Sequence, residues 1–313
     1  MLTNKALITG AAGFCGQHLA RLLLKHGYAV VGFDVRLSHV PGVENIIGDL
    51  HDADFVQQML KATQPTHVFH LAAATGSTDR LEDFLNINVH GTQTLLKALS
   101  NNNQWPVILI AGSSAAYGRV APNELPIVES QPFRPSTAYA VSKIAQELVG
   151  YQHYAAYGAR VLSTRTFNLT GPGESMHFVT SAFARQIAEI EARKREPVLY
   201  VGNLNAVRDF TDVRDAMRAY LLLAEQGLPG EVYNVCSGEG TCIREILQLL
   251  LELSTHRDIQ IQIDPLRLQT ADVPIQIGSA EKLNALTGWT PTLTRRETLN
   301  DVLNSWRCRI REE

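Results

Sequence analysis

The sequence has few cysteines, and they lie far from any pattern that builds a disulfide framework or a metal site. The chain of 313 residues has four of them, at Cys15, Cys236, Cys242 and Cys308. None belongs to a Cys-x-x-Cys pair or to a cluster with histidine. This spacing predicts reduced thiols, no metal centre and a reducing compartment, which we expect to be the cytoplasm.

The sequence also lacks a strong charge of one sign and a long apolar run. Its 28 Lys and Arg nearly balance its 31 Asp and Glu, for a formal net charge of -3, so no basic patch for nucleic acid is expected. No segment has the roughly 18 unbroken apolar residues of a membrane helix. The N-terminus carries no secretory signal pattern. Hydrophobic residues make up 45% of the chain, enough for the core of a soluble globular protein.

The first half alternates apolar runs with segments of helical periodicity. We expect strands over residues 5–10, 29–34, 43–49, 66–73, 106–112 and 159–168. We expect helices over residues 14–26, 52–62, 79–100 and 137–157. This alternation predicts an α/β fold with a doubly wound parallel Rossmann sheet, covered by helices on both faces.

The pattern changes after residue 168. A loop at 169–175, a helix at 178–193 and a strand at 197–202 are followed by a loop that becomes a helix over 208–227, a strand at 231–238, a helix at 241–254 and a short mixed end. We therefore expect a Rossmann domain of residues 1–168 plus about 206–228. A smaller mixed α/β lobe would comprise about 169–205 and 229–313.

The turn between the first strand and the first helix carries three glycines. Gly10, Gly13 and Gly16 are spaced three apart. Glycine allows a tight turn and a close approach of backbone to a pyrophosphate, and the helix N-terminus offers free N–H groups to the anion. The turn therefore predicts a dinucleotide-binding site. Cys15, inside the turn, is interpreted as a small filling side chain.

An acidic residue ends the second expected strand. Asp34 follows Gly16 by 18 residues, where a carboxylate binds the adenosine ribose hydroxyls and repels a 2′-phosphate. It favours NAD(H) as the cofactor, with NADP(H) as the alternative because Arg36 is close enough to reach a 2′-phosphate. Asp49, after the third strand, is placed to meet the adenine amino group or to cap its own loop.

A tyrosine and a lysine four residues apart share one face of the helix at 137–157. The ammonium of Lys143 is expected to lower the pKa of Tyr139, which is about 10 in a free side chain. Ser113 and Ser114 follow the fifth strand and supply a hydroxyl for the reacting oxygen. Together they predict a proton-transfer site. His70, within the fourth strand, is interpreted as a core residue.

These motifs resemble the extended short-chain dehydrogenase/reductases over nearly the whole chain. The resemblance rests on the glycine turn and on GDL (48–50), HLAA (70–73), NVHGT (88–92), SSAAYG (113–118), YAVSK (139–143) and FNLTGPG (167–173). The segments at 178–191, 201–220, 230–238 and 277–289 look like the branch that contains the GDP-mannose 4,6-dehydratases and the GDP-4-keto-6-deoxy-mannose reductases.

One position separates the two activities of that branch. The dehydratases carry an acid/base carboxylate two residues before the tyrosine that matches Tyr117, and here that residue is Ala115, followed by Ala116. Alanine transfers no proton, so the resemblance implies a reductase. Hydride from NAD(P)H would reach carbon 4 of a GDP-4-keto-6-deoxyhexose, with GDP-D-rhamnose as the product. Tyr139 would donate the proton, and Lys143 would hold the nicotinamide ribose.

The resemblance also assigns binding residues. Beyond the glycines and acids above, the implied cofactor contacts are Phe14, Cys15, Leu50, Leu71, Ala72, Ala73, Asn88 and Phe167. The implied substrate contacts are Ser114, Asn168, Val179, Asn203, Arg208 and Asp272.

Some of these assignments have alternatives. Arg208 would hold the diphosphate, or else pair with Asp209 or Asp212. Two positions depart from the pattern, because Ala182 and Gln269 stand where basic residues are usual. A different base or a different 4-keto sugar therefore stays open.

Two other functions use the same residues. A nucleotide-sugar 4-epimerase would keep NAD tightly bound and use the same serine, tyrosine and lysine. A non-catalytic NAD(P)-sensing regulator would have no need of a proton donor. The resemblance further implies a homodimer that pairs through the helices at 79–100 and 137–157.

Overall fold

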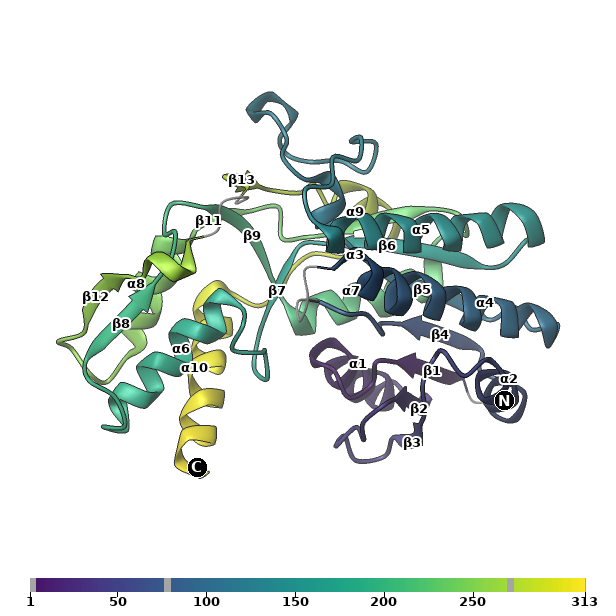
Figure 1. The fold of residues 1–313 in the computed structure, drawn as a ribbon, viewed down its shortest axis with the longest axis horizontal. Coiled ribbons are helices and arrows are strands. Elements are labelled where there is room, and N and C mark those ends of the chain that lie inside the picture. Colours follow the sequence, from purple (N-terminus) through teal and green to yellow (C-terminus); the bar gives the residue numbers. More distant parts are fainter. Residues whose placement is uncertain (1–3, 76–79, 269–272, 313) are drawn as a thin grey trace.

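The computed structural model describes residues 4–75, 80–268 and 273–312. Figure 1 shows a larger part, built on a parallel sheet and containing the N-terminus, beside a smaller part that contains the C-terminus. No helix within the described ranges has the length and apolar character needed to cross a bilayer.

The larger part is organised by a seven-stranded sheet in which every neighbouring pair is parallel. In spatial order its strands are β3 (Glu44–Ile47), β2 (Ala29–Asp34), β1 (Lys5–Thr9), β4 (His67–His70), β5 (Val107–Ser113), β6 (Val161–Thr166) and β10 (Val232–Val235). After β1 the chain adds β2 and β3 on one side, and then β4, β5 and β6 on the other side of β1. The predicted doubly wound Rossmann sheet is confirmed, and ligands of such sheets bind where the direction reverses.

Both faces of this sheet are buried because alternate side chains point to opposite sides. Ile8 belongs to the core under α1 (Phe14–Lys25) and α7 (Val213–Gln226), whereas its neighbour Leu7 belongs to the core under α2 (Ala53–Thr63) and α4 (Gly91–Asn101). The long helix α5 (Ala138–Tyr157) lies on the same side as α4. Continuous apolar strands with two buried faces are typical of parallel sheets.

The expected helix at 79–100 is divided into three segments. It runs from α3 (Leu81–Phe84) through the π-helical segment η1 (Leu85–His90) into α4. A π-helical turn inside an α-helix often marks a functional site. This one carries Asn88, whose side chain is fully buried.

The smaller part has a core of its own. It is formed by α6 (Val179–Glu191), α8 (Ile243–Leu253), α10 (Arg295–Glu312) and β8 (Val198–Val201), and β8 pairs in parallel with the exposed strand β12 (Gln260–Ile263). The expected short mixed end is wrong, because α10 spans 18 residues. Its buried Leu299, Val302, Leu303 and Trp306 recur at helical spacing.

A third, smaller sheet joins the two parts. Its central strand β9 (Val207–Asp212) pairs with β7 (Asn168–Thr170), β11 (Gly240–Cys242) and β13 (Ile275–Gln276). We expected a loop over β9. It forms a strand because distant segments supply its partners, a signal absent from its own polar sequence.

The predicted domain boundary also needs a correction. Residues 229–313 were assigned to the smaller lobe, but β10 pairs with β6 in the main sheet, and α9 (Glu281–Thr287) packs against α7 and β10. The buried ring of Trp289 belongs to the same core as β1 and α7. The chain therefore returns to the Rossmann core before it ends in α10.

This return is held by a buried carboxylate. Asp215 of α7 accepts hydrogen bonds from the backbone N–H groups of Thr292 and Leu293 and from the Thr292 hydroxyl, all at 2.8–2.9 Å, and pairs with Arg218 at 2.7 Å. Burial opposes the ionisation of Asp215, but the hydrogen bonds outweigh it, so the pKa of this carboxyl lies below its usual value. A carboxyl with a lowered folded-state pKa stabilises the fold above its unfolded pKa of about 3.9 and loses that effect as pH falls.

We predict that Asp215→Asn lowers the free energy of unfolding by about 1–3 kcal/mol at pH 7, because two backbone donors would lose a charged acceptor. The difference from the wild type should shrink as pH falls below about 4, because the unfolded carboxyl takes up a proton there and the folded one does so only at lower pH. Urea unfolding at several pH values measures it. Asp258→Asn, at an exposed site, is the control, and an equal loss at both positions would contradict the prediction.

Candidate active site

The glycine turn closes over the carboxyl end of β1. Gly10 has φ of +75°, and a Cβ there would lie 2.8 Å from the backbone nitrogen of Ala72 in the loop after β4. A Cβ on Gly16 would lie only 2.2 Å from the Gly10 carbonyl oxygen. No side chain caps the first turn of α1 at Gly13, so that helix end keeps its backbone donors for a ligand. The turn has the shape that a pyrophosphate requires.

Asp34 is fixed beside this turn. Its carboxylate accepts hydrogen bonds from the backbone N–H groups of Ala12, at 3.0 Å, and Arg36, at 3.1 Å. The carboxylate therefore joins the glycine turn to the end of β2. The side chain of Arg36 is exposed.

Asp49 takes the loop-capping position that was the alternative to an adenine contact. It accepts from the backbone N–H of His51 at 3.0 Å and lies 2.7 Å from the ring Nδ1 of that residue. Leu50, the next residue, is buried in the core below α2 and α4.

The remaining cofactor positions border the loop after β4. Leu71, Ala72 and Ala73 are partly exposed at this edge. Asn88 links this loop to α5. Its side chain accepts from the backbone N–H of Ala74 at 2.8 Å and donates to the Ser142 hydroxyl at 2.9 Å. Its amide is therefore engaged within the protein, so it acts on this edge through the loop.

Three other predicted cofactor residues, Phe167, Cys15 and Phe14, have side chains that pack within the protein. The ring of Phe167 lies 6.2 Å from that of Tyr117 in a small core, and its backbone N–H donates to the Val235 carbonyl at 2.9 Å. Burial raises the pKa of the Cys15 thiol to about 12, with Glu174 acting in the same direction. The thiol is therefore neutral and unreactive, in agreement with its interpretation as a filling side chain. Phe14 packs edge-on against His18, with ring centroids 5.4 Å apart.

The serine and the tyrosine meet at the same sheet edge. Ser113 is the last residue of β5, and Tyr139 lies in the first turn of α5, where the Thr137 side chain caps the helix. The Ser113 hydroxyl lies close enough to the Tyr139 phenol to act on its pKa. Burial raises the pKa of Tyr139, although Ser113 acts the other way. The tyrosine is thus a protonated phenol at neutral pH.

Lys143 lies one turn further along α5 and is buried. Its Nζ donates to the Ala111 carbonyl at 2.6 Å and to the side-chain oxygen of Gln146. Burial lowers the pKa of Lys143 to about 7, against the effect of Glu147. The expected lowering of the Tyr139 pKa by this ammonium is not found, because burial dominates at the tyrosine and the lysine is held by other acceptors.

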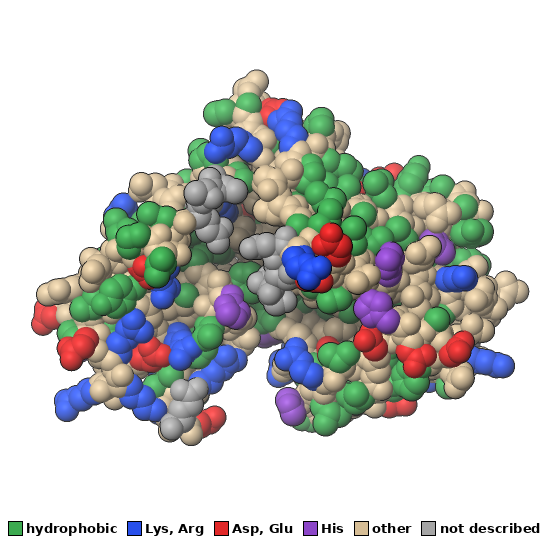
Figure 2. Space-filling view, viewed as in Figure 1, with side chains coloured by type: hydrophobic (Ala, Val, Ile, Leu, Met, Phe, Trp, Pro, Cys, Tyr) green, Lys and Arg blue, Asp and Glu red, His purple; other side chains and the backbone are tan. Residues whose placement is uncertain are grey.

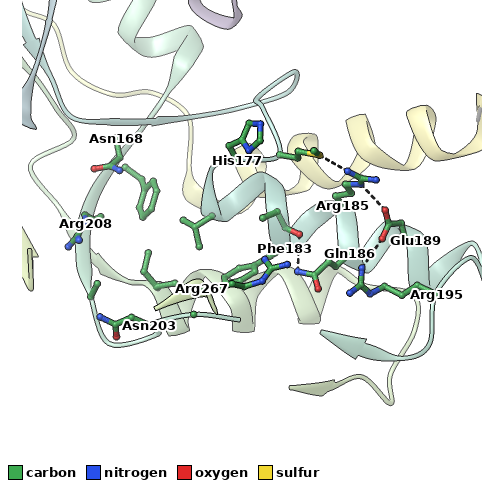
Figure 3. A pocket seen from close by; sticks show the side chains of 17 residues that line it. Asn168, His177, Phe183, Arg185, Gln186, Glu189, Arg195, Asn203, Arg208 and Arg267 are labelled. Atoms are coloured by element: carbon green, nitrogen blue, oxygen red, sulfur yellow. Dashed lines mark hydrogen bonds and ion pairs between the residues drawn. The ribbon is translucent and has the colours of Figure 1, made fainter. Parts of the chain in front are cut away.

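A cavity of about 680 Å³ lies in the smaller part, with α6 and β9 among the elements that line it. Four of the predicted substrate residues line it, namely Asn168, Val179, Asn203 and Arg208. Figure 3 shows Asn168 and Arg208 at one end of it, with Arg267 between them and the far end. In the space-filling view the surface is hollowed between the larger and smaller parts (Figure 2).

The sheet register connects this cavity to the catalytic side chains. Ser113 pairs with Thr166 across β5 and β6, and Asn168 follows Thr166 by two residues. Asn168 then starts β7, opposite Phe210 of β9, and both residues line the cavity. The cavity wall at Asn168 therefore lies two residues along the chain from the strand partner of Ser113.

The alternative partners of Arg208 are engaged elsewhere. Asp209 accepts from the backbone of Ser237, Gly238 and Gly278, and Asp212 pairs with Arg214 at 2.8 Å. The guanidinium of Arg208 donates to the Val207 carbonyl at 2.9 Å and lines the cavity.

Two predictions fall elsewhere. Asp272 and Gln269 lie outside the described residues. Ser114 is buried in the short helix η2 (Ser114–Tyr117), and its carbonyl accepts from Gln276 at 2.9 Å.

Sequence reasoning missed several charged residues of the cavity. Arg267, in the short helix η4 (Pro265–Arg267), lines it and pairs with Asp264 at 3.2 Å. At the far end Glu189 lies between Arg185 and Arg195, at 2.7 and 3.1 Å (Figure 3). The helical spacing of Val179, Gln186 and Glu189 on α6 was a signal for part of this wall, whereas Arg267 comes from an exposed segment with none. Within the described ranges no three His, Cys, Asp or Glu side chains gather as metal ligands do.

The arrangement of the glycine turn, the Ser113–Tyr139 pair and the arginine-lined cavity agrees with a family match over residues 7–302, to the model of GDP-mannose 4,6 dehydratase. The chain belongs to this family. It is 36% identical to the GDP-6-deoxy-D-mannose reductase of Pseudomonas aeruginosa, over the whole length of both chains.

Two solved structures are similar to the whole fold. A structure of RMD from Pseudomonas aeruginosa, complexed with NADPH, has a TM-score of 0.87 and 35% identity, covering 98% of this chain and all of that one. The UDP-glucose 4-epimerase of Thermus thermophilus, in complex with NAD, has a TM-score of 0.86 and 29% identity, covering 97% of this chain and 99% of that one. Both cofactors are nicotinamide dinucleotides, and one of the two carries a 2′-phosphate.

Proposed function

We propose that the protein is a reductase that transfers hydride from NAD(P)H to the 4-keto group of a GDP-4-keto-6-deoxyhexose, giving a product of the GDP-D-rhamnose type. The observation that carries this proposal is the pairing of Ser113 with Tyr139 at the edge of the main sheet, followed by alanines at 115 and 116, in a chain that also has an arginine-lined cavity. The site has a proton donor and an anion-binding wall, but no carboxylate at the position that dehydration needs. The name of the Pseudomonas aeruginosa relative supports the same activity.

The chain's own residues supply the proton and the orientation. The glycine turn and the uncapped start of α1 fit the pyrophosphate of a nicotinamide cofactor, which supplies the hydride when bound. The raised pKa of Tyr139 keeps its phenol protonated, as a proton donor to the substrate oxygen must be. Ser113 lies beside that phenol and would bind the same oxygen. One hydride and one proton convert the ketone to an alcohol.

The cavity provides the charge to bind a nucleoside diphosphate. Arg208 and Arg267 both line it, and Asn168 stands at the end nearest the catalytic edge. Guanidinium groups bind phosphate oxygens through strong charge-assisted hydrogen bonds. We therefore place the diphosphate near Asn168 and Arg208, with the sugar toward Tyr139.

A nucleotide-sugar 4-epimerase is the second candidate, and the similarity to the Thermus thermophilus enzyme favours it. It would use Ser113, Tyr139 and Lys143 in the same way. The two functions differ in their balance, because a reductase consumes one reduced cofactor for each product and an epimerase consumes none.

We predict that the wild type oxidises NADH or NADPH when mixed with GDP-4-keto-6-deoxy-mannose. Tyr139→Phe should lower kcat by about 10²–10⁴-fold, since it removes the proton donor and keeps the ring. Tyr151→Phe, at an exposed position of the same helix, is the matched control. Absorbance at the reduced-cofactor band follows the reaction. A wild type that oxidises neither cofactor, yet interconverts the two C4 epimers of a nucleotide hexose, would replace the reductase with the epimerase.

We further predict a preference for NADH, because a 2′-phosphate would meet the fixed carboxylate of Asp34. Asp34→Ala should shift the ratio of kcat/KM for NADPH over NADH upward by about tenfold or more, the effect of roughly 1.4 kcal/mol. Arg36 would then favour the phosphate without opposition. An unchanged ratio would show that Asp34 does not select the cofactor.

We also propose a cytoplasmic homodimer that pairs through α5 and the helical run from α3 to α4. Of these, α5 presents Leu148, Tyr151 and Tyr157, each more than half exposed, on the surface of the larger part. Sedimentation should give a species of twice the 34.5 kDa chain mass, and a Leu148→Asp, Tyr151→Asp double variant should give the monomer. Leu266→Asp, at a position 95% exposed in the smaller part, should stay dimeric. A monomeric wild type would contradict the proposal.

A further inference from the structure

A row of buried polar side chains runs beneath the catalytic edge and ends at Lys143. Thr9 of β1, His70 of β4, Thr92 of α4 and Gln146 of α5 form it, and each is at most 1% exposed. We call these four residues the Thr9–Gln146 row. Polar side chains at this depth occur in place of apolar ones only at a cost, unless all their hydrogen bonds are made.

The hydroxyl of Thr92 fixes the direction of the bonds. It donates to the Asn88 carbonyl at 2.6 Å, and this uses its single hydrogen. It must therefore accept both from the Gln146 amide nitrogen, at 2.8 Å, and from the His70 Nε2, at 2.7 Å. Asn88 is the same residue that holds the loop after β4.

The direction at Thr92 determines the tautomer of His70. Its proton lies on Nε2, so Nδ1 accepts from the Thr9 hydroxyl, 2.7 Å away, and that oxygen in turn accepts from the backbone N–H of Ala72 at 3.3 Å. Burial lowers the pKa of His70 to about 3, with Lys143 acting in the same direction. The imidazole is thus neutral throughout the physiological range.

The direction at Thr92 also orients Gln146. Because its amide nitrogen must donate to Thr92, its oxygen is turned toward Lys143 and accepts from Nζ. A flipped amide would set an N–H group against the ammonium. The oxygen of Gln146 and the Ala111 carbonyl together fix the position of Nζ under the site.

We infer that Thr92, with His70 as one of its donors, is a positioning residue that orients Gln146 and thereby holds Lys143 in place as an ammonium for the reaction. The inference rests on the proposed function, in which Lys143 serves the reductase site. It assigns a role to His70, which the sequence alone indicated only as a core residue.

The charged and titratable groups around Lys143 are few. Glu147 on its own helix favours the ammonium, and His70 of β4 is neutral. Tyr139, one turn earlier on α5, is a protonated phenol. Ala111 of β5 contributes only its carbonyl. The acceptor oxygen of Gln146 is therefore a main support of the charge.

The test compares pH profiles of kcat/KM for the reduction. The descending limb of the wild type should reflect loss of the ammonium. Thr92→Val keeps the shape of the side chain but removes the hydroxyl, so Gln146 loses the partner that orients it. The descending limb should then move at least about half a pH unit lower, and the rate should fall about tenfold. Thr92→Ser keeps the hydroxyl and should match the wild type. Gln146→Glu places a carboxylate beside Nζ and should move the limb higher.

The opposite shifts of Thr92→Val and Gln146→Glu support the inference, since a purely structural role would lower the rate without moving the limb in two directions. A Thr92→Val limb equal to that of the wild type, or shifts of the same sign, would overturn it. If Thr92→Val does not fold, Gln146→Glu alone decides, and an unmoved limb overturns the inference.

A second measurement needs no substrate and separates this inference from the proposed function. Long-range ¹H–¹⁵N NMR of the ¹⁵N-histidine-labelled wild type should give the Nε2–H tautomer of His70, unchanged between pH 5 and 9. An Nδ1–H or a cationic His70 would overturn the row of bonds described here. A wild type without reductase activity that nevertheless shows this tautomer would contradict the proposed function and leave the orientation of Gln146 standing.

Discussion

The parallel direction of the main sheet is the constraint on which the site depends. Because all seven strands run the same way, the glycine turn after β1, the loop after β4 and the serine at the end of β5 reach one edge together. Across the pairing of β5 with β6, Ser113 lies opposite Thr166, and Asn168 of the cavity wall follows Thr166 by two residues. Residues scattered over more than 150 positions of sequence are thereby brought to one edge of the sheet.

Buried carboxylates hold the parts that the main sheet does not reach. Asp209 of β9 accepts four hydrogen bonds of its own, from Ser237, Gly238 and Gly278, and this fastens the joining sheet to the ends of two other segments. Asp212 and Asp215, at the start of α7, do the same for α10 and for the segment before it. A buried carboxylate with several donors is stable, whereas the donors would be costly to leave unpaired.

The Rossmann part was predictable because its signals are local. Apolar strands, a glycine turn and a Tyr-x-x-x-Lys pair on one helix can be recognised within a few residues of each other. The joining sheet was not predictable, because β9 is polar and takes its partners from segments that lie up to about 70 residues away. The same limit applies to the site: Ser113 and Tyr139 follow from local patterns, but the approach of Arg267 and the bond from Gln146 to Thr92 depend on how distant elements pack.

The short connection between the catalytic edge and the cavity has a geometric consequence. Asn168 lies two residues beyond the strand partner of Ser113, and two extended residues span at most about 7 Å. In the proposed function, the paired strands thus fix the distance between the bound diphosphate at Asn168 and the hydroxyls at Ser113 and Tyr139. The distance of a ligand atom from the bound diphosphate would then decide whether that atom reaches Tyr139. The chemical identity of the reacting group would matter less.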